Sequence, residues 1–250
     1  MARGQAEETI SVSPIIPESV TVGILGTSPL VMNRMSEKAR MQLLMPTGPK
    51  TAADKRSSLK HVPIDEYRGS VYRLTDGPTV LAMPTTAVKG TLMTAALDTG
   101  GVARTQIGRL VYVVGDYLPV WGVPKLLMSI TRSADIARTP DVRTRAILPH
   151  WCMFATIRYV PPLLNRTTIV NLLSRAGLTA GVGDWRQEKG KGSYGQFDVV
   201  SAEDERMIMI MESEGRIAQE AALQEPDCYD SETADLFAWY TAEVIKRGKK

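Results

Sequence analysis

Two hydrophobic patterns alternate along the chain: short apolar runs rich in β-branched residues, and stretches in which apolar residues recur with helical spacing. The short runs are bounded by glycine and proline and have the length of buried strands. They predict strands at residues 19–26, 110–114, 126–131, 151–160, 196–200 and 207–211. Residues 67–83 predict a strand pair that turns at Asp76-Gly77, a common turn dipeptide.

The helical spacing predicts helices at residues 36–45, 84–97 and 167–176. The last is the clearest, because Ile169, Leu172, Leu173 and Ala176 have the i, i+3, i+4, i+7 spacing of one helical face. Thr85 or Thr86 is the expected N-cap of the second helix, and Gly177 is expected just past the end of the third. Two acidic segments, about 213–224 and 232–247, predict further helices.

The long elements follow the order strand, helix, strand, strand, helix, strand, which is that of a ferredoxin-like domain of the RRM type. We therefore predict an α+β fold. It has an N-terminal arm at 1–18, the ferredoxin-like (RRM-type) domain at 19–200 and an acidic helical C-terminal appendage at 201–250. The core carries long insertions at about 27–83 and 98–150. One of them contains a long basic loop, residues 46–62, with no periodicity.

Composition is ordinary for a globular protein, with 44% hydrophobic and 23% charged residues, but the net charge of +3 hides an asymmetry. Residues 1–200 carry 24 Lys and Arg against 15 Asp and Glu, a balance of +9. Residues 201–250 carry 6 against 12, a balance of −6. A basic body followed by an acidic segment favours a polyanionic partner for the body. It also raises the hypothesis that the acidic segment docks on the basic body of its own or a neighbouring copy.

Several protein classes are excluded by what the sequence lacks. The only cysteines are Cys152 and Cys228, which are too few for a disulfide scaffold or a cysteine-based zinc site. The only histidines are His61 and His150, so acid–base catalysis by histidine would have to use one of these two. No apolar run has the roughly 18 residues of a membrane span, and residues 1–14 have no signal-peptide core. We expect a cytoplasmic protein without metal or cofactor.

The glycine-rich segment 181–197 is the most informative stretch. Its glycines Gly190, Gly192 and Gly195 match the dinucleotide-binding string, but they precede a strand, whereas that motif must open a helix. The segment instead predicts a basic loop whose backbone can approach a partner closely. Arg186, Lys189 and Lys191 supply charge, and Trp185 and Tyr194 supply flat faces for stacking bases. Charge combined with stacking is typical of proteins that bind single-stranded nucleic acid. An ordinary surface hairpin is the alternative.

Two further groups of basic residues are candidates for phosphate contacts. Lys89 lies one turn into the second predicted helix, near the N-terminal end where free N–H groups attract anions. The arginines form a second set, which we expect in a loop and just after the first strand, since the guanidinium fork matches phosphate geometry. They are Arg132, Arg138, Arg143 and Arg145, together with Arg34 and Arg40. Solvated faces and structural Arg–Asp pairs remain alternatives for these residues.

Three segments together resemble the RAMP superfamily, the RNA-binding subunits of CRISPR effector complexes. Met83-Pro84-Thr85-Thr86-Ala87-Val88-Lys89-Gly90-Thr91-Leu92 is similar to the family's helix entry. Gly192-Ser193-Tyr194-Gly195-Gln196-Phe197 is similar to its glycine-rich loop, and Ser28-Pro29-Leu30 to the loop after its first strand. The resemblance covers roughly residues 19–200. It implies an RRM-like core with thumb-like and finger-like insertions, in a backbone subunit that assembles along guide RNA and grips its phosphates.

The sequence also departs from the family pattern. Met93 stands where the family helix usually has arginine, and Asn33 lies in a loop without the aspartate that RNA-cleaving backbone subunits use. We therefore predict a non-catalytic protein that binds single-stranded RNA or DNA and oligomerises along it. It would act either with other effector-complex subunits or as a stand-alone filament-forming relative from a phage or mobile element. The alternatives are a metal-independent endoribonuclease using His61 or His150, and a structural assembly protein with acidic protein partners.

Overall fold

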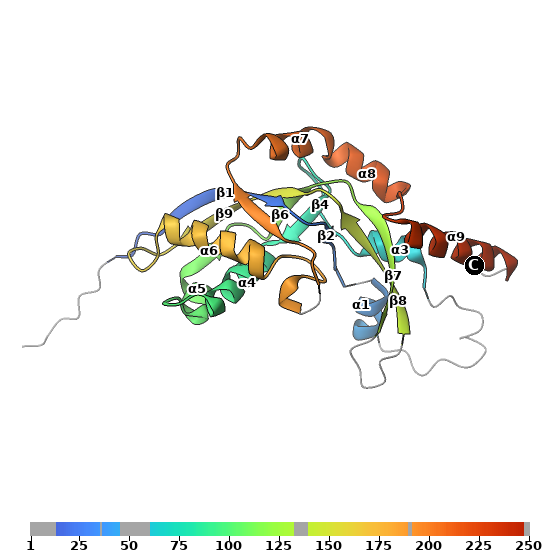
Figure 1. Cartoon of the computed structure of the whole chain (residues 1–250), viewed down its shortest axis with the longest axis horizontal. Helices are drawn as coiled ribbons and strands as arrows, with labels where there is room; N and C mark the ends of the chain where they lie inside the picture. Colours follow the sequence, from blue (N-terminus) through green and yellow to red (C-terminus); the bar gives the residue numbers. More distant parts are fainter. Residues whose placement is uncertain (1–13, 36, 46–60, 133–139, 190–191, 248–250) are drawn as a thin grey trace, which may run out of the picture.

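The computed structural model describes residues 14–35, 37–45, 61–132, 140–189 and 192–247 (Figure 1). Its larger sheet has seven strands: β1 (Glu18–Gly26), β3 (Tyr72–Arg73), β4 (Leu81–Pro84), β5 (Val111–Val113), β6 (Tyr117–Trp121), β9 (Cys152–Tyr159) and β10 (Phe197–Val200). The path through this sheet is β10-β1-β9-β6-β4-β3, and β5 pairs with the other end of β9. All of these pairings are antiparallel.

Four of these strands and two helices form the predicted core order. The helix α4 (Thr85–Ala95) lies between β1 and β5 in the chain, and α6 (Arg166–Thr179) lies between β9 and β10. The strands stand in the order β10-β1-β9-β5, and both helices lie on the same side of the sheet (Figure 1). This is the connectivity of the split β-α-β unit. The helices cover this side of the sheet because Val20, Val22 and Ile24, which alternate along β1, present their apolar side chains to it and are buried there.

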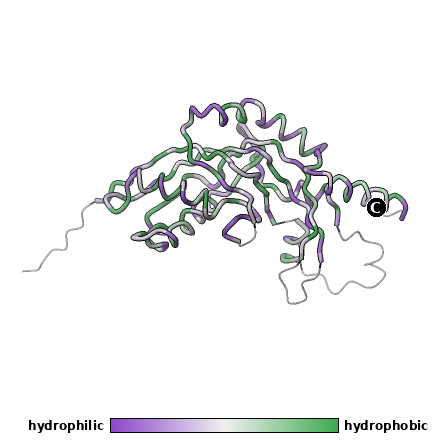
Figure 2. The backbone as a smooth tube through the Cα atoms, viewed as in Figure 1, coloured by the Kyte–Doolittle hydropathy of each residue, from purple (hydrophilic) through white to green (hydrophobic). Residues whose placement is uncertain are grey.

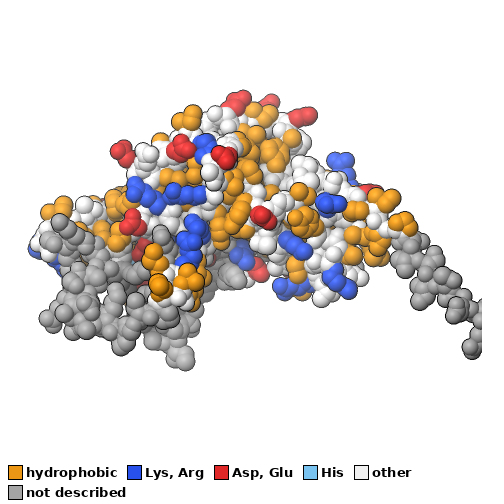
Figure 3. All heavy atoms as spheres, turned by 180° about the vertical axis from the view of Figure 1, so that it is seen from behind, with side chains coloured by type: hydrophobic (Ala, Val, Ile, Leu, Met, Phe, Trp, Pro, Cys, Tyr) orange, Lys and Arg blue, Asp and Glu red, His pale blue; other side chains and the backbone are white. Residues whose placement is uncertain are grey.

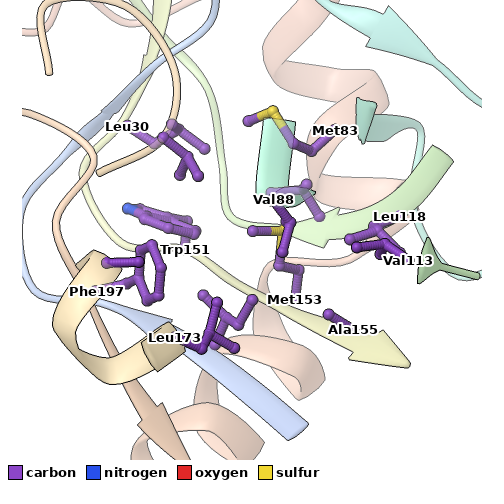
Figure 4. Packing of buried hydrophobic residues seen from close by; sticks show 14 of the residues in the cluster. Leu30, Met83, Val88, Val113, Leu118, Trp151, Met153, Ala155, Leu173 and Phe197 are labelled. Carbon is purple, nitrogen blue, oxygen red and sulfur yellow. The ribbon is translucent and has the colours of Figure 1, made fainter. Parts of the chain in front are cut away.

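The core centres on Trp151, whose indole is fully buried between β1, α6 and β10 (Figure 4). Its Nε1 donates a hydrogen bond to the carbonyl of Ser28 at 2.8 Å, and its ring meets Phe197 edge-on at 6.4 Å between centroids. Gly26 leaves room for the indole, because a side chain there would overlap it. Gly177 serves similarly in α6, where it lies against the backbone of Phe197. The predicted helix end at Gly177 is therefore wrong: the helix continues to Thr179.

A second, three-stranded sheet lies beside the first and has the order β2-β8-β7. Its strands are β2 (Leu30–Val31), β7 (Lys125–Arg132) and β8 (Pro140–Leu148). The helices α3 (Pro63–Gly69) and α9 (Ser231–Lys246) pack against it, and α1 (Glu37–Leu44) lies near its far end (Figure 1). The predicted loop around Arg143 and Arg145 is thus wrong, because both arginines are on β8. Their alternation with Val142, Thr144 and Ala146 has the period of a strand.

Other sequence predictions also need correction. Residues 63–69 are helical, so the predicted strand pair is confined to β3 and β4, which turn through Gly77 at φ 100°. The expected threonine caps of α4 do not form, since Pro84 occupies the cap position and no side chain caps the helix. Residues 207–211 are not a strand but part of α7 (Glu205–Ser213).

The run 207–211 within α7 is apolar at every position, which is compatible with a helix as well as with a strand. Met207, Ile210 and Met211 share one face and pack on Leu25 and Cys152, on the side of the sheet opposite α4 and α6. The Asp204 carboxylate accepts a hydrogen bond from the amide of Arg206 at 3.0 Å and caps the helix. Figure 2 shows the resulting contrast: hydrophobic residues recur along the central strands, whereas the outer helices alternate in hydropathy.

The last helices, α8 (Arg216–Gln224) and α9, are built into the same folded unit. Gln219 of α8 is fully buried, and its Oε1 accepts hydrogen bonds from the amides of Val80 and Leu81 at 2.8 and 3.0 Å. Its Nε2 donates to the carbonyls of Val120 and Gly122 at 2.8 and 3.1 Å. The segment expected as an acidic appendage therefore completes hydrogen bonds of β4 and β6. Among the described residues, no helix is both long and apolar enough to cross a membrane.

Replacing Gln219 with leucine tests how strongly α8 is integrated. Gln219→Leu leaves the four backbone groups around it unpaired and should lower the free energy of unfolding by about 2–4 kcal/mol. Chemical denaturation measures this change. The matched control is Glu220→Gln on the same helix, which removes only an exposed ion pair with Arg216 and should change stability by less than about 0.5 kcal/mol. Equal stability of both variants would contradict the integration of α8.

Candidate nucleic-acid interface

Two segments singled out in the sequence, α4 and the glycine-rich loop, are hydrogen-bonded to each other. The Thr91 hydroxyl donates to the carbonyl of Gly181 at 3.0 Å. The Thr94 hydroxyl lies 3.1 Å from Oε1 of Glu188, which follows further along the loop. These contacts bring together residues about ninety positions apart in the chain. The two motifs thus form one surface.

The glycines of the loop allow close approach within the chain itself. Gly181, Gly183 and Gly195 have φ values of 68°, 82° and 71°, which side chains rarely adopt. The amide of Val182 donates to the carbonyl of Gly195 at 2.9 Å, and a side chain on Gly195 would overlap the carbonyl of Val182. Gly192 lies similarly close to the carbonyl of Trp185. The loop is therefore held closed by its own backbone at these positions.

The same loop is attached to the second sheet through β2. The amide of Asp184 donates to the carbonyl of Val31 at 2.9 Å. The rings of Trp185 and Tyr194 lie 6.1 Å apart at 41° and pack on Val31 and two further buried residues of this sheet, Leu127 and Ile147. Both rings are half-buried, so part of the aromatic surface predicted for base stacking is used in internal packing. Trp185 also has an unusual φ of 50° for a non-glycine residue.

A pocket of about 240 Å³ lies between α4, the loop and the start of α5 (Arg104–Leu110). One wall consists of small side chains of α4 with helical spacing, a second wall of loop residues, and Arg104 lies at its margin. The lining residues are Thr86, Ala87, Gly90, Thr91, Thr94, Arg104, Val182, Gly183, Arg186 and Glu188. A side chain added at Gly90 would meet nothing within 4 Å, so this wall is open to an incoming group.

Two arginines and one glutamate give the pocket a net positive charge. Arg186 donates through Nε to Glu188 at 2.8 Å and through Nη1 to the carbonyl of Gly183 at 2.8 Å. A second ion-pair contact from Nη2 to Glu188 measures 2.7 Å. The guanidinium is therefore fixed in orientation and partly neutralised. Arg104 is exposed and makes no ion pair with the described residues, so it is the pocket's most available cation.

The predicted basic residues are only partly gathered at this pocket. Arg186 lines it, and Arg145 lies nearby, with its Nε 3.9 Å from the Asp184 carboxylate. Burial lowers the pKa of Arg145, and Arg143 adds to this effect while Asp184 opposes it. Lys89 is half-buried on α4 but does not line the pocket. Arg40, on α1, is half-buried with its Nε unpaired among the described residues.

Several predicted residues cannot be assessed in this way. Arg138, Gly190 and Lys191 lie outside the described residues. Arg132 is on β7 and Lys189 ends the short 3-10 helix Gln187–Lys189, but their side chains are not described. Most of the basic loop 46–62 and of the arm 1–18 also falls outside the described residues.

Arg34 belongs to a different arginine cluster, which the sequence analysis missed. Its amide donates to the carbonyl of Ser70 at 2.8 Å, near Arg68 and Arg73. Burial lowers the pKa of Arg73, and the charges of Arg34 and Arg68 lower it further. Arg68 donates to the carbonyls of Leu223 and Gln224, both at 2.8 Å, at the C-terminal end of α8. Arg68 thus connects the cluster to α8. The C-terminal end of a helix is a favourable position for a cation because of the helix dipole.

Each of the two histidines lies near a carboxylate, and neither lines the pocket. His61 lies between Glu66, 2.8 Å from Nδ1, and Asp141, 3.1 Å from Nε2. His150 is exposed, with its Nδ1 3.8 Å from Glu214. Within the described part of the chain, no group of three or more His, Cys, Asp or Glu could hold a metal ion. Burial raises the pKa of the Cys152 thiol to about 12, so this cysteine is not a reactive thiolate.

Arg104 and the small face of α4 are the functional candidates that sequence reasoning did not identify. Ala87, Gly90, Thr91 and Thr94 have the i, i+3, i+4, i+7 spacing of a helical face. A face of small residues within an otherwise apolar helix signals close approach of another group and could have been recognised. Arg104 gives no local signal, because only the packing of α5 against α4 brings it to the pocket.

Comparison with known proteins gives structural matches only. No protein-family model matches the chain, and no curated protein matches it. The fold is similar to a chain in the cryo-EM structure of the type III-B Cmr-beta complex bound to cognate target RNA. The TM-score is 0.41 and the identity 13%, over 74% of this chain and 59% of that one. The chain thus matches a little over half the length of that protein. It is also similar to Cmr6 from Pyrococcus furiosus, with a TM-score of 0.38 and 11% identity, over 74% and 98% of the two chains.

The dependence of the loop on glycine at position 195 is testable. Gly195→Ala combines a positive φ with a clash against Val182 and should lower the free energy of unfolding by about 2 kcal/mol or more. The matched control, Gly90→Ala, is in open space within a helix and should be neutral or stabilising by up to about 1 kcal/mol. Thermal and urea denaturation measure both variants. A stable Gly195→Ala protein would show that the loop is not held as described.

Proposed function

We propose that this chain binds single-stranded nucleic acid, with the pocket between α4 and the glycine-rich loop holding a unit of the phosphate backbone. The observation that carries the proposal is that two motifs distant in sequence meet around an open, positively charged hollow. Arg104 and Arg186 supply positive charge, and the hydroxyl of Thr86 supplies a further hydrogen-bonding group. Gly90 gives the strand room to approach the helix.

The partly enclosed aromatic pair beside the pocket supports a single strand rather than a duplex. Trp185 and Tyr194 are half-buried, and their remaining surface offers a platform against which an unpaired base stacks. A duplex keeps its bases stacked on one another and presents mainly its backbone and groove edges. The proposal covers RNA and DNA alike, because no described contact is specific for a 2′-hydroxyl.

The proposal includes assembly in the manner of a RAMP-type backbone subunit. The antiparallel β10-β1-β9-β5 arrangement supports an RRM-type core, and the β2-β8-β7 sheet is the counterpart of the expected thumb-like or finger-like insertions. Copies of the chain would lie side by side along one strand, each holding a short segment of it. Guide RNA within an effector complex and a free single strand coated by a stand-alone relative are both partners of the proposed kind.

Cleavage is not part of this proposal. The strongest candidate for a catalytic base in the alternative, His61, has each ring nitrogen at a carboxylate rather than at the pocket. Incubation of the purified protein with labelled RNA, in the presence of a chelator, should therefore leave the RNA intact. Cleavage that disappears in both His61→Ala and a His61→Ala, His150→Ala protein would favour the endoribonuclease instead. A structural assembly protein predicts no oligonucleotide affinity at all.

Arg104 offers the sharpest test of the proposed site. Arg104→Ala should weaken the binding of a single-stranded oligonucleotide and reduce the slope of log affinity against log salt by about 0.7, the value for one lost phosphate contact. Fluorescence anisotropy over a range of salt concentrations measures this slope. The control is Arg109→Ala, which removes an exposed arginine of the same helix that does not line the pocket. Identical slopes for both variants and the unmodified protein would rule out the pocket as a phosphate site.

A further inference from the structure

One edge of the larger sheet is only half covered. The strand β9 pairs with β1 from Glu18 to Leu25, whereas β10 pairs with the opposite edge of β1 only from Gly23 to Gly26. After Val200 the chain turns through Ser201 and Ala202 toward α7. Among the described residues, no strand therefore accompanies residues 18–22 of β1 on the β10 side.

The backbone of this edge is oriented to accept another strand. Residues of β1 alternate between the two neighbours: Gly26 donates to Trp151 on the β9 side and Thr27 to Gln196 on the β10 side, both at 2.9 Å. By this alternation, the N–H and C=O groups of Ser19 and Thr21 point to the side that β10 has left. Both residues are exposed. They offer the hydrogen-bond pattern that an added strand uses.

A groove runs along this edge, and its side chains would contact those of an added strand. Its volume is about 240 Å³, and it is bounded by the edge of β1, the first two turns of α6 and the end of β10. Val170, Phe154 and Val199 supply apolar surface, and Arg166 supplies a positive charge at one end. An edge strand beside a helix is the arrangement in which peptides are bound by strand addition. The groove is separate from the nucleic-acid pocket, since α6, about 20 Å long, lies between the groove and the glycine-rich loop.

We propose that the occupant is the N-terminal segment Glu7–Ser13 of a second copy of this chain. The segment reads Glu7-Glu8-Thr9-Ile10-Ser11-Val12-Ser13, a short run of alternating polar and apolar residues with β-branched side chains. Pro14 follows directly and ends any strand pairing. The run of seven residues is long enough to cover the five unaccompanied residues 18–22, and its alternation allows one apolar face to enter the groove.

The existing strand pairing favours one direction for the added strand. β10 pairs with β1 in antiparallel register and ends at the pair of Gly23 with Val200. An added strand that continues in the direction of β10 is also antiparallel to β1, and antiparallel pairing is slightly more stable per residue than parallel pairing. In this orientation Glu7 lies near Gly23, and Ser13 lies near Glu18.

The arm reaches a neighbour rather than its own groove. Residues 14–17 are exposed and continue away from the body of the molecule beyond β1 (Figure 1). Folding back would require a tight turn within Pro14-Ile15-Ile16-Pro17, where the prolines fix two φ angles. The four linking residues 14–17 span at most about 14 Å in extended form, so the groove that accepts the arm belongs to a subunit that lies directly beside the start of β1. Each copy would donate one arm and accept another, which is a head-to-tail contact that builds chains of subunits.

Two measurements on nucleic-acid-free protein test this inference independently of the proposed nucleic-acid binding. In analytical ultracentrifugation, the full chain should associate as its concentration rises, and a protein lacking residues 1–13 should remain monomeric. A fluorescent peptide of residues 6–14 should bind the shortened protein. Association that is unchanged by the deletion would overturn the proposal. So would a monomeric full chain whose peptide binds only the shortened protein, because the arm would then occupy its own groove.

Substitutions in the groove identify the binding surface. Val170→Glu places a carboxylate in the apolar wall beside the acidic arm and should weaken peptide binding by about tenfold or more. Asn171→Glu adds the same charge at an exposed position of the same helix and should leave binding within about twofold. Thr21→Pro removes an outward N–H from an edge strand and should also abolish binding. Circular dichroism establishes that each variant is folded, and equal peptide affinity in Val170→Glu and Asn171→Glu would place the arm elsewhere.

Discussion

The closure of the chain between Gly181 and Gly195 is the contact on which the arrangement of this molecule depends. The amide of Val182 donates a hydrogen bond to the carbonyl of Gly195. Close to this bond, the carbonyl of Gly181 accepts from Thr91 of α4, and the amide of Asp184 donates to Val31 of β2. One loop thus joins the core helices to the second sheet. Because the backbone segments almost touch, only glycine can occupy several of these positions. The pocket exists because this loop holds α4 at a fixed distance.

Much of the core could be predicted from the sequence because its signals are local. The alternation in β1 and the helical spacing in α6 each depend on which side of one element is buried, and both predictions are confirmed. The errors occur where a distant contact overrides a local preference. Gly177 looks like a helix end until Phe197 packs against it, and residues 207–211 look like a strand until Gly23 provides space for Met207. The arginines of β8 looked like part of a loop because the carboxylate beside Arg145, that of Asp184, is distant in sequence.

The charge asymmetry takes on a different meaning in three dimensions. The acidic segment is joined to the body mainly by groups other than its carboxylates. Gln219 bonds to the backbone around β4 and β6, Met207 fills the space beside Gly23, and Arg216 donates to the carbonyl of Thr79. Glu214, which accepts a hydrogen bond from the amide of Val123, is an exception. Acidic side chains gather along the upper rim in Figure 3, where α7 and α8 lie, and Lys and Arg spread over the face below. The docking of a free acidic tail is therefore unnecessary to explain its presence. Separation of the charges leaves the basic regions accessible to a polyanion.

The most direct test of the account is to locate a bound strand on the protein. A single-stranded RNA carrying photoreactive uridines can be bound to the purified chain, cross-linked by light and mapped by mass spectrometry of the resulting peptides. The account predicts cross-links to α4, to the region of Arg104 and to Val182, Gly183 and Arg186 of the loop, which line the pocket. Absence of binding, or cross-links confined to the cluster of Arg34, Arg68 and Arg73, would contradict it.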